Sequence, residues 1–214
     1  MHDAGVVIGK LVLGWLLGSL SGSLLMGRLR GVDIRTMGSG NAGGTNALRT
    51  VGWRFAIAVV AIDVGKGVLA AWLGFADVGD ALHAAVDPLV QACACGFMAV
   101  LGHCWPVFFG FRGGKGGATA FGAVLMIAPW LALAMAALWV LLILIGRYVG
   151  LATVLTALAG PLLVAAPGLL DGQVSNALLL FAVSVAALIT FTHRSNLARM
   201  RAGTEPRIGG SSAP

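Results

Sequence analysis

The chain has 214 residues, of which 58% are hydrophobic and only 10% are charged. Globular proteins carry about 25% charged residues, so this composition argues against a soluble enzyme, a nucleic-acid-binding domain and a disordered segment. The net charge is +6, but in so apolar a chain basic residues are typical of the cytoplasmic loops of a membrane protein.

Six long apolar runs are candidates for membrane helices, each of which needs about 20 residues to cross the hydrocarbon core. In chain order they cover residues 11–27, 55–76, 88–111, 118–146, 151–170 and 172–192. Only the second run holds charged side chains, Asp63 and Lys66, which are three residues apart and therefore share a helix face. No small-residue cleavage site follows the first run, so we expect a retained helix and not a signal peptide.

Charged residues are sorted between the connections. Basic residues gather in segments 28–54 and 112–117, at Arg147, and in segment 193–214, whereas the other connections hold Asp77, Asp80, Asp87 and Asp171. The positive-inside rule therefore places the basic segments in the cytoplasm and the N-terminus outside.

The run 118–146 decides the topology. As a single span it would put Arg147 outside, whereas two crossings return every basic segment to the cytoplasm. As a helix the run is about 43 Å long, less than two full crossings of about 30 Å, and Pro129 supplies a break. We therefore predict two short helices, about 118–128 and 130–146. The expected fold is all-α: one membrane domain over residues 1–214 with seven transmembrane helices, the N-terminus outside and the C-terminus cytoplasmic.

The first cytoplasmic segment, residues 33–49, reads DIRTMGSGNAGGTNALR. Its glycines let backbone N–H groups approach an anion closely. The side chains of Ser39, Asn41 and Asn46 add donors, and Arg49 adds a charge. The alternative is an ordinary polar loop, but such loops rarely combine so many small donors with so few charges.

The second segment, residues 102–119, reads GHCWPVFFGFRGGKGGAT. Glycines flank Lys115 and a helix is predicted to follow, which favours phosphate binding by backbone amides, a helix N-terminus and a cation. The segment lacks the spacing of a nucleotide-binding P-loop, which argues against nucleotide hydrolysis. His103 is either a hydrogen-bonded core residue or part of the site.

The third segment follows the last apolar run. His193 and Asn196 share a face if the last helix continues, and Glu205 is expected to order the nearby arginines; a basic helix end that holds lipid head groups is the alternative. The pair Asp63 and Lys66 is either functional or structural support. Three cysteines within one apolar run form neither a disulfide framework nor a zinc site, and we predict no metal.

Three segments suited to anions on one face of the membrane predict a site for phosphate-bearing substrates. The same segments resemble three motifs of the PlsY family of bacterial acyl-phosphate:glycerol-3-phosphate acyltransferases. The resemblance covers nearly the whole chain and is carried by Gly38-Ser39-Gly40-Asn41-x-Gly43-x-Thr45-Asn46-x-x-Arg49, by Gly102-His103-x-x-Pro106 with Gly113-Gly114-Lys115-Gly116, and by His193-x-x-Asn196-x-x-Arg199 with Gly203-x-Glu205. Asp63-x-x-Lys66-Gly67 also looks like a family pattern.

The resemblance implies an inner-membrane enzyme with its site on the cytoplasmic face, moving an acyl group from acyl phosphate to the 1-hydroxyl of glycerol 3-phosphate. The products are lysophosphatidic acid and phosphate, and no cofactor is needed. The implied catalytic residues are Ser39, Lys115, His193 and Asn196. The implied glycerol-3-phosphate contacts are Ser39, Asn46, Arg49, Lys115, His193 and Asn196. The implied acyl-phosphate contacts are Asn41, Gly113, Gly114, Gly116 and Thr153.

Two residues depart from the family pattern: Gly44 stands where alanine is usual, and Gly150 where serine is common, which leaves Thr153 as the local hydroxyl. Either His193 or a substrate phosphate is the base. The other functions considered are a transporter for a phosphorylated solute, which lacks support because the sequence holds no internal repeat, and a membrane scaffold, which leaves the donor-rich motifs unexplained. We expect partners to be the two substrates and the lipid bilayer, without nucleic acid, and the active form to be a monomer.

Overall fold

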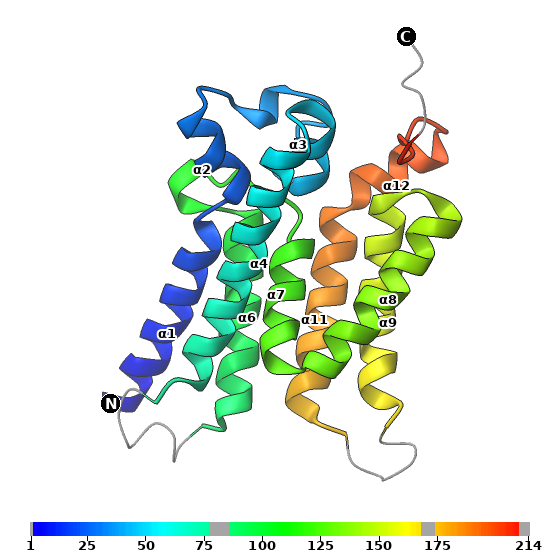
Figure 1. Ribbon diagram of the computed structural model, residues 1–214. Helices are drawn as coiled ribbons and strands as arrows, with labels where there is room; N and C mark the ends of the chain where they lie inside the picture. The colour runs from blue at the N-terminus through cyan, green and yellow to red at the C-terminus, as the bar shows by residue number, and fades with distance from the viewer. Residues whose placement is uncertain (1, 78–85, 168–173, 210–214) are drawn as a thin grey trace. The chain divides into compact units, whose positions relative to one another are not determined.

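The computed structural model describes residues 2–77, 86–167 and 174–209, and within these ranges every regular element is a helix (Figure 1). The chain divides into two compact units, Met1–Pro129 and Trp130–Pro214, which are described in turn. Asp80 and Asp171, used above to sort the connections, lie outside the described residues, as do residues 168–173 at the ends of two expected runs.

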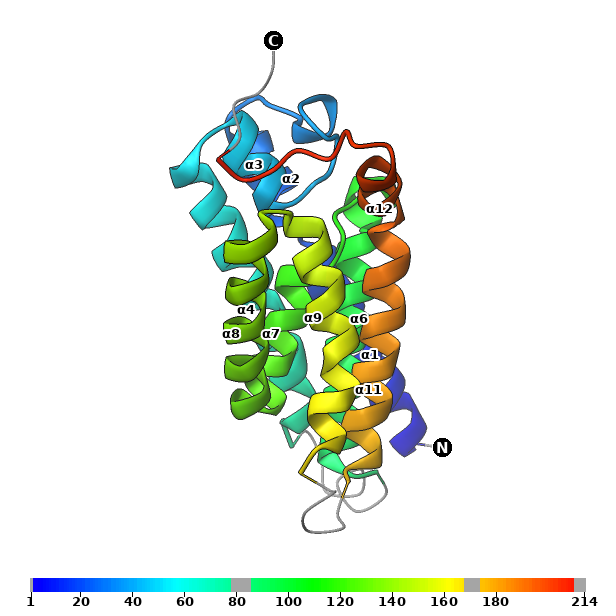
Figure 2. The ribbon, with the colours of Figure 1, turned by 90° about the vertical axis from the view of Figure 1, so that its right-hand side faces the viewer.

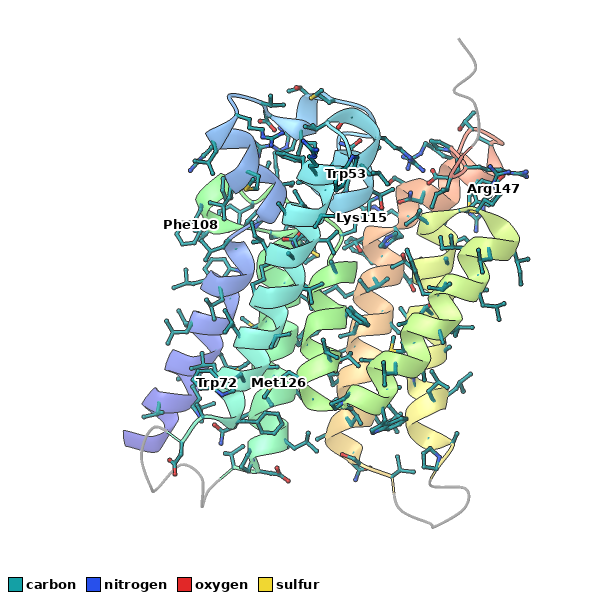
Figure 3. The ribbon with its side chains drawn as sticks, viewed as in Figure 1. Trp53, Trp72, Phe108, Lys115, Met126 and Arg147 are labelled. Carbon is teal, nitrogen blue, oxygen red and sulfur yellow. The ribbon has the colours of Figure 1, made fainter. Side chains whose placement is uncertain are left out.

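The first unit is built on four helices that lie side by side: α1 (His2–Ser19), α4 (Trp53–Phe75), α6 (Pro88–Cys104) and α7 (Gly117–Ile127). The short helices α2 (Gly22–Leu29) and α3 (Gly44–Thr50) lie at the end of this bundle where α6 ends and α7 begins (Figure 1). Two 3-10 turns, η1 (Ile34–Thr36) and η2 (Val107–Phe109), belong to the same polar segments. Figure 3 shows Lys115 and Trp53 at this end, and Trp72 and Met126 toward the other.

Glycines bring the long helices of the first unit into backbone contact. A Cβ added at Gly18 of α1 would collide with the Ala99 backbone of α6, and one added at Gly67 of α4 would collide with the Thr119 carbonyl of α7. Small residues that allow such close approach are typical of helix packing in membranes, where burial from water does not drive helices together.

The second unit contains α8 (Pro129–Gly146), which begins with the last residue of the first unit, and α9 (Val149–Ala165), α11 (Asn176–Thr192) and α12 (Arg194–Arg201). Helices α9 and α11 pack side by side (Figure 2). The Ser175 side chain caps the start of α11 by accepting a hydrogen bond from the Leu178 N–H. Helix α12 follows α11 after a bend of 52°.

The predicted pair of short helices at 118–128 and 130–146 is confirmed as α7 and α8, with each boundary within one residue. Pro129 opens α8, where its missing N–H costs nothing. The prediction that 11–27 is one helix is wrong, because the chain breaks between Ser19 and Gly22 and turns by 49°. The break leaves backbone groups without helical partners, and side chains of α4 bind them, as described below.

Three helical stretches are long and apolar enough to cross a membrane: Trp53–Phe75, Pro88–Phe109 and Pro129–Gly146. The count rises to five if each bent pair, α1 with α2 and α11 with α12, forms one span. Helices α7 and α9 are apolar but shorter. The described residues thus supply three to five candidate spans.

Candidate functional site

Asp33 and Arg35 shape the start of the first polar segment and tie it to the second. Asp33 Oδ1 accepts a hydrogen bond from the Arg35 backbone N–H at 2.9 Å, and the two side chains form an ion pair at 2.7 Å. The hydrogen bonds from Arg35 hold the pKa of the Asp33 carboxyl below its ordinary value. Arg35 Nη1 also donates to the carbonyl of Phe109 at 3.0 Å. Because Phe109 lies 74 residues further along the chain, sequence spacing gives no sign of this link.

Asn46 organises the first segment from within. Its side chain is buried, and its Nδ2 donates to the carbonyls of Ile34 at 3.1 Å and Met37 at 3.0 Å. Its Oδ1 accepts from the backbone N–H of Ser39 at 3.0 Å. The structure therefore directs the polar atoms of Asn46, predicted to contact a substrate, at the loop backbone.

Around Asn46 the other predicted residues of this segment are accessible. Ser39 and Arg49 are exposed and Asn41 is half-buried. Gly38 has φ of +54°, and a Cβ there would collide with Asn46 Oδ1, so this turn needs a glycine. Ser39 in the loop and Arg49 in α3 are thus exposed around the buried Asn46.

The glycine loop of the second segment folds back onto the end of α6. The N–H of Gly113 donates to the Cys104 carbonyl at 3.2 Å, and the N–H of Gly114 donates to the His103 carbonyl at 3.1 Å. Gly116 is the N-cap of α7 with φ of +87°. Two of the predicted glycine amides are thus held by helix carbonyls. The N–H groups of the first turn of α7 have no acceptor within the helix.

Lys115 stands between these glycines and is half-buried. It directly precedes the N-cap of α7, where the helix dipole favours negative charge. A cation, glycine backbone and a helix N-terminus therefore meet at one point, as the sequence predicts for a phosphate site.

A buried charged cluster lies beneath the two segments. The predicted pairing of Asp63 with Lys66 is confirmed, with Lys66 Nζ and Asp63 Oδ1 2.9 Å apart and both side chains buried. His103 is also buried, and its Nδ1 lies 2.8 Å from Lys66 Nζ. The cluster also closes the break between α1 and α2, because Lys66 Nζ donates to the Leu20 carbonyl at 3.2 Å and Asp63 Oδ1 accepts from the Gly22 N–H at 3.0 Å.

In the second unit, His193 lies at the bend between α11 and α12. The last helix does not continue, which was the condition for His193 and Asn196 to share a face: His193 caps α11 and the chain changes direction there. The buried His193 ring places Nδ1 2.8 Å from the Ile189 carbonyl. A carbonyl only accepts, so Nδ1 is the donor, and in neutral imidazole the lone pair lies on Nε2.

Glu205 joins Asn196 to Arg199. Its Oε1 accepts from Asn196 Nδ2 at 2.6 Å and its Oε2 accepts from Arg199 Nε at 2.7 Å. The expectation that Glu205 orders neighbouring arginines is confirmed for Arg199. A Cβ at Gly150 of α9 would come within 2.8 Å of the Asn196 side chain, so the glycine found here provides room for that amide.

The C-terminal segment binds back onto the connection between α8 and α9. Ile208 N–H donates to the Arg147 carbonyl, and Arg147 Nε donates to the Ile208 carbonyl, each at 2.8 Å. The Arg207 guanidinium stacks over the Tyr148 ring, 5.0 Å from its centre, and donates to its hydroxyl. Figure 3 shows Arg147 beside this segment. The sequence did not predict this contact, because Arg147 and Ile208 are 61 residues apart in the chain.

Thr153, predicted as a hydroxyl for acyl phosphate, makes two hydrogen bonds within the second unit. Its Oγ1 donates to the Val149 carbonyl at 2.8 Å and accepts from Trp139 Nε1 at 3.0 Å. The hydroxyl proton is therefore held by a helix carbonyl in this arrangement. The first unit brings together the first two predicted segments, and the second unit brings together His193, Asn196 and Glu205.

Comparison with known proteins identifies the family. The family model for glycerol-3-phosphate acyltransferase matches residues 8–203. A glycerol-3-phosphate acyltransferase of Chlorobium chlorochromatii (strain CaD3) is 38% identical over 94% of this chain and 97% of its own length. That of Synechococcus sp. (strain CC9902) is 41% identical over 93% of this chain and 94% of its own length.

Solved structures agree. The crystal structure of PlsY (YgiH), an integral membrane glycerol 3-phosphate acyltransferase, in its glycerol 3-phosphate form is 34% identical, with a TM-score of 0.82 over 95% of this chain and 96% of that one. The lysophosphatidic acid form gives a TM-score of 0.79 at 33% identity, over 94% of each chain. The expected enzyme class, an all-helical integral membrane acyltransferase, is confirmed. The chain belongs to the PlsY family of membrane glycerol-3-phosphate acyltransferases.

Proposed function

We propose that this enzyme takes its acyl group from acyl phosphate and transfers it to the 1-hydroxyl of glycerol 3-phosphate in phospholipid biosynthesis. Lysophosphatidic acid and phosphate are the products. The observation that carries the proposal is the glycine loop around Lys115, which leads directly into the N-terminus of α7 and is suited to a phosphate.

Acyl phosphate is assigned to this loop. Gly113 and Gly114 allow the phosphate to approach the backbone closely, while Gly116 and the first turn of α7 supply N–H groups. Asn41 adds an amide. Thr153 is assigned a donating contact, for which its hydroxyl must turn from the Val149 carbonyl to the phosphate, because an ionised acyl phosphate offers only acceptors.

Glycerol 3-phosphate is assigned to polar residues of all three motifs. Arg49 and Lys115 hold the charge of its phosphate, and Ser39 donates a hydrogen bond. Asn46 acts by fixing the backbone of Ser39, as its hydrogen bonds indicate. His193 and Asn196 of the second unit orient the glycerol hydroxyls.

The reaction is an acyl transfer between oxygens. The 1-hydroxyl oxygen attacks the acyl carbonyl carbon, the bond from that carbon to the phosphate oxygen breaks, and phosphate leaves with the electron pair. Acyl phosphate is an activated mixed anhydride, so positioning and charge stabilisation supply much of the catalysis. His193 takes the hydroxyl proton on Nε2, which the bond from Nδ1 to Ile189 leaves as the basic nitrogen. A phosphate of the substrates is the alternative acceptor.

The proposed topology has seven membrane helices in a bacterial inner membrane, with the N-terminus outside, the C-terminus inside and the site on the cytoplasmic face. The sorting of the basic segments supports it, as does the break at Pro129. We propose a monomer that works without a cofactor or metal.

The test is phosphate release by the purified protein given acyl phosphate and glycerol 3-phosphate. We expect release that depends on both substrates, and no transfer when acyl-CoA replaces acyl phosphate. Strict dependence on acyl-CoA would overturn the proposed donor. Transport of glycerol 3-phosphate into sealed vesicles without acylation would support a transporter instead.

A further inference from the structure

Lys66 fixes which nitrogen of His103 carries its proton. The Lys66 ammonium is buried and has three oriented contacts: Asp63 Oδ1 at 2.9 Å, the Leu20 carbonyl at 3.2 Å and His103 Nδ1 at 2.8 Å. An ammonium has three donors and no acceptor, so each contact takes one N–H. His103 Nδ1 must therefore accept.

The alternative arrangement, with Nδ1 donating to Asp63, fits the distances less well. His103 Nδ1 lies 3.4 Å from Asp63 Oδ1 but 2.8 Å from Lys66 Nζ. A proton on Nδ1 would face an ammonium proton across the shorter distance. Neutral imidazole carries one N–H, which is then on Nε2.

His103 Nε2 faces the place where the first two motifs meet. A Cβ added at Gly114 would collide with Nε2 and would come within 2.7 Å of the Ala42 carbonyl. Nε2 and the Ala42 carbonyl thus both lie against the side of Gly114 where a Cβ would stand, and Gly114 is the residue before Lys115. The carbonyl of His103 also accepts the Gly114 N–H, so His103 contacts the loop through both its ring and its backbone.

We propose that His103 is a positioning residue for the glycine loop, and that Asp63 and Lys66 act through it by keeping Nδ1 as the acceptor and Nε2 protonated. The buried ion pair then has a second role besides binding the free backbone groups at the break between α1 and α2. It sets the protonation of the ring nitrogen that lies against Gly114, next to Lys115. The effect on catalysis rests on the proposed function, whereas the state of the ring does not.

The direct test is nitrogen NMR of the full chain in lipid nanodiscs with 15N-labelled histidine, at one fixed pH. The chain has four histidines, and His103 is assigned by the resonances lost in His103→Gln. We expect an unprotonated Nδ1 and a protonated Nε2. A protonated Nδ1, or a ring protonated on both nitrogens, overturns the proposal.

Lys66→Met tests what holds the ring in this state. With the ammonium gone and Asp63 still present, we expect the proton to move to Nδ1 and be donated to Asp63. Lys10→Met is the matched control. Lys10 is equally buried in the first unit but binds Ala76 and Gln91, so its removal leaves the His103 pattern unchanged. An unchanged pattern in Lys66→Met would show that Lys66 does not set it.

Two substitutions of His103 test its effect on the loop. His103→Asn keeps an acceptor near Nδ1 and removes the donor at Nε2, whereas His103→Gln keeps a donor near Nε2. We expect kcat/KM for acyl phosphate to fall about tenfold in His103→Asn and to recover to within about threefold of the original in His103→Gln. KM for glycerol 3-phosphate should change little in either. Equal losses in both variants would indicate a packing role only and overturn the proposal.

If Lys66→Met does not fold, two results still test the proposal. They are the protonation of the His103 ring in the unsubstituted protein and the ratio of kcat/KM for acyl phosphate between His103→Gln and His103→Asn. If acyl phosphate is not the donor at all, the proposed function fails while the NMR result stands. If His103 were protonated on Nδ1 while acyl transfer from acyl phosphate was normal, this inference would be rejected and the proposed function would stand.

Discussion

Two buried histidines are both held at Nδ1 but in opposite tautomers. His103 Nδ1 lies against an ammonium and accepts, whereas His193 Nδ1 lies against a carbonyl and donates. In the neutral state His103 therefore presents an N–H from Nε2, and His193 has its lone pair there. Only the latter arrangement provides a general base, so neighbouring donors and acceptors, and not residue type, separate the two roles.

His193→Asn tests the assignment of the base. The asparagine amide keeps a donor near the position of Nδ1 for the Ile189 carbonyl, but removes Nε2. We expect the thermal unfolding midpoint to stay close to that of the parent and kcat to fall about 100-fold or more, because a positioned base contributes that much or more. If most of kcat remained in this variant and in His193→Gln, the proton would go to a substrate phosphate.

Arg49→Ala tests the assigned phosphate contact of the first motif. Losing a charge-assisted hydrogen bond to a phosphate should raise KM for glycerol 3-phosphate about tenfold, with a smaller change for acyl phosphate. Arg54→Ala is the matched control, since Arg54 is also exposed but stacks over Trp53, 5.2 Å from its ring centre. Steady-state kinetics with each substrate varied in turn gives the two KM values for each variant. An unchanged KM in Arg49→Ala would remove this contact.

Helix contacts in the first unit depend on single glycines of α4. A Cβ added at Gly67 would collide with the Thr119 carbonyl and would lie 3.0 Å from the Ala123 nitrogen. A Cβ added at Gly65 would have no neighbouring atom within 4 Å. We expect Gly67→Ala to lower the free energy of unfolding by about 1–3 kcal/mol through overpacking. Gly65→Ala should leave it unchanged or raise it by up to about 1 kcal/mol, because alanine favours a helix. Thermal unfolding in detergent compares them, and equal shifts would contradict a packing role for Gly67.

The apolar runs predict where helices form better than where they end or bend. Pro129 marks the boundary between α7 and α8 because proline has a defined local effect. The break after Ser19 carries no such mark. It is stabilised by Lys66 and Asp63, more than 40 residues away, so only tertiary contacts reveal it. The bend at His193 is likewise missed by an argument that assumes one continuing helix.

The motifs predict which residues lie near one another within each unit better than what each one contacts. The glycines around Lys115 predict a phosphate-binding loop from composition alone. The inward direction of Asn46, the bonds made by Thr153 and the link from Arg35 to Phe109 depend on the folded backbone, which spacing along the chain does not give.

Arg147 decides the arrangement of the whole chain in the membrane. It directly follows α8, so it lies in the cytoplasm if α7 and α8 together go out and back, and outside if they form a single crossing. Its exposed side chain makes it a suitable labelling site. The three native cysteines are buried and free, and replacing them with alanine gives a parent without thiols.

In that parent, Arg147→Cys and Ala202→Cys are expected to resist a membrane-impermeant maleimide in intact spheroplasts and to react in inverted vesicles. Asp3→Cys, near the N-terminus, should show the reverse pattern and serves as the control. The positive-inside rule requires Arg147 and the C-terminal arginines to share one side. Labelling of residue 147 from outside would leave a single crossing between residues 118 and 146. The count of seven membrane helices would then be wrong, while the family would stand.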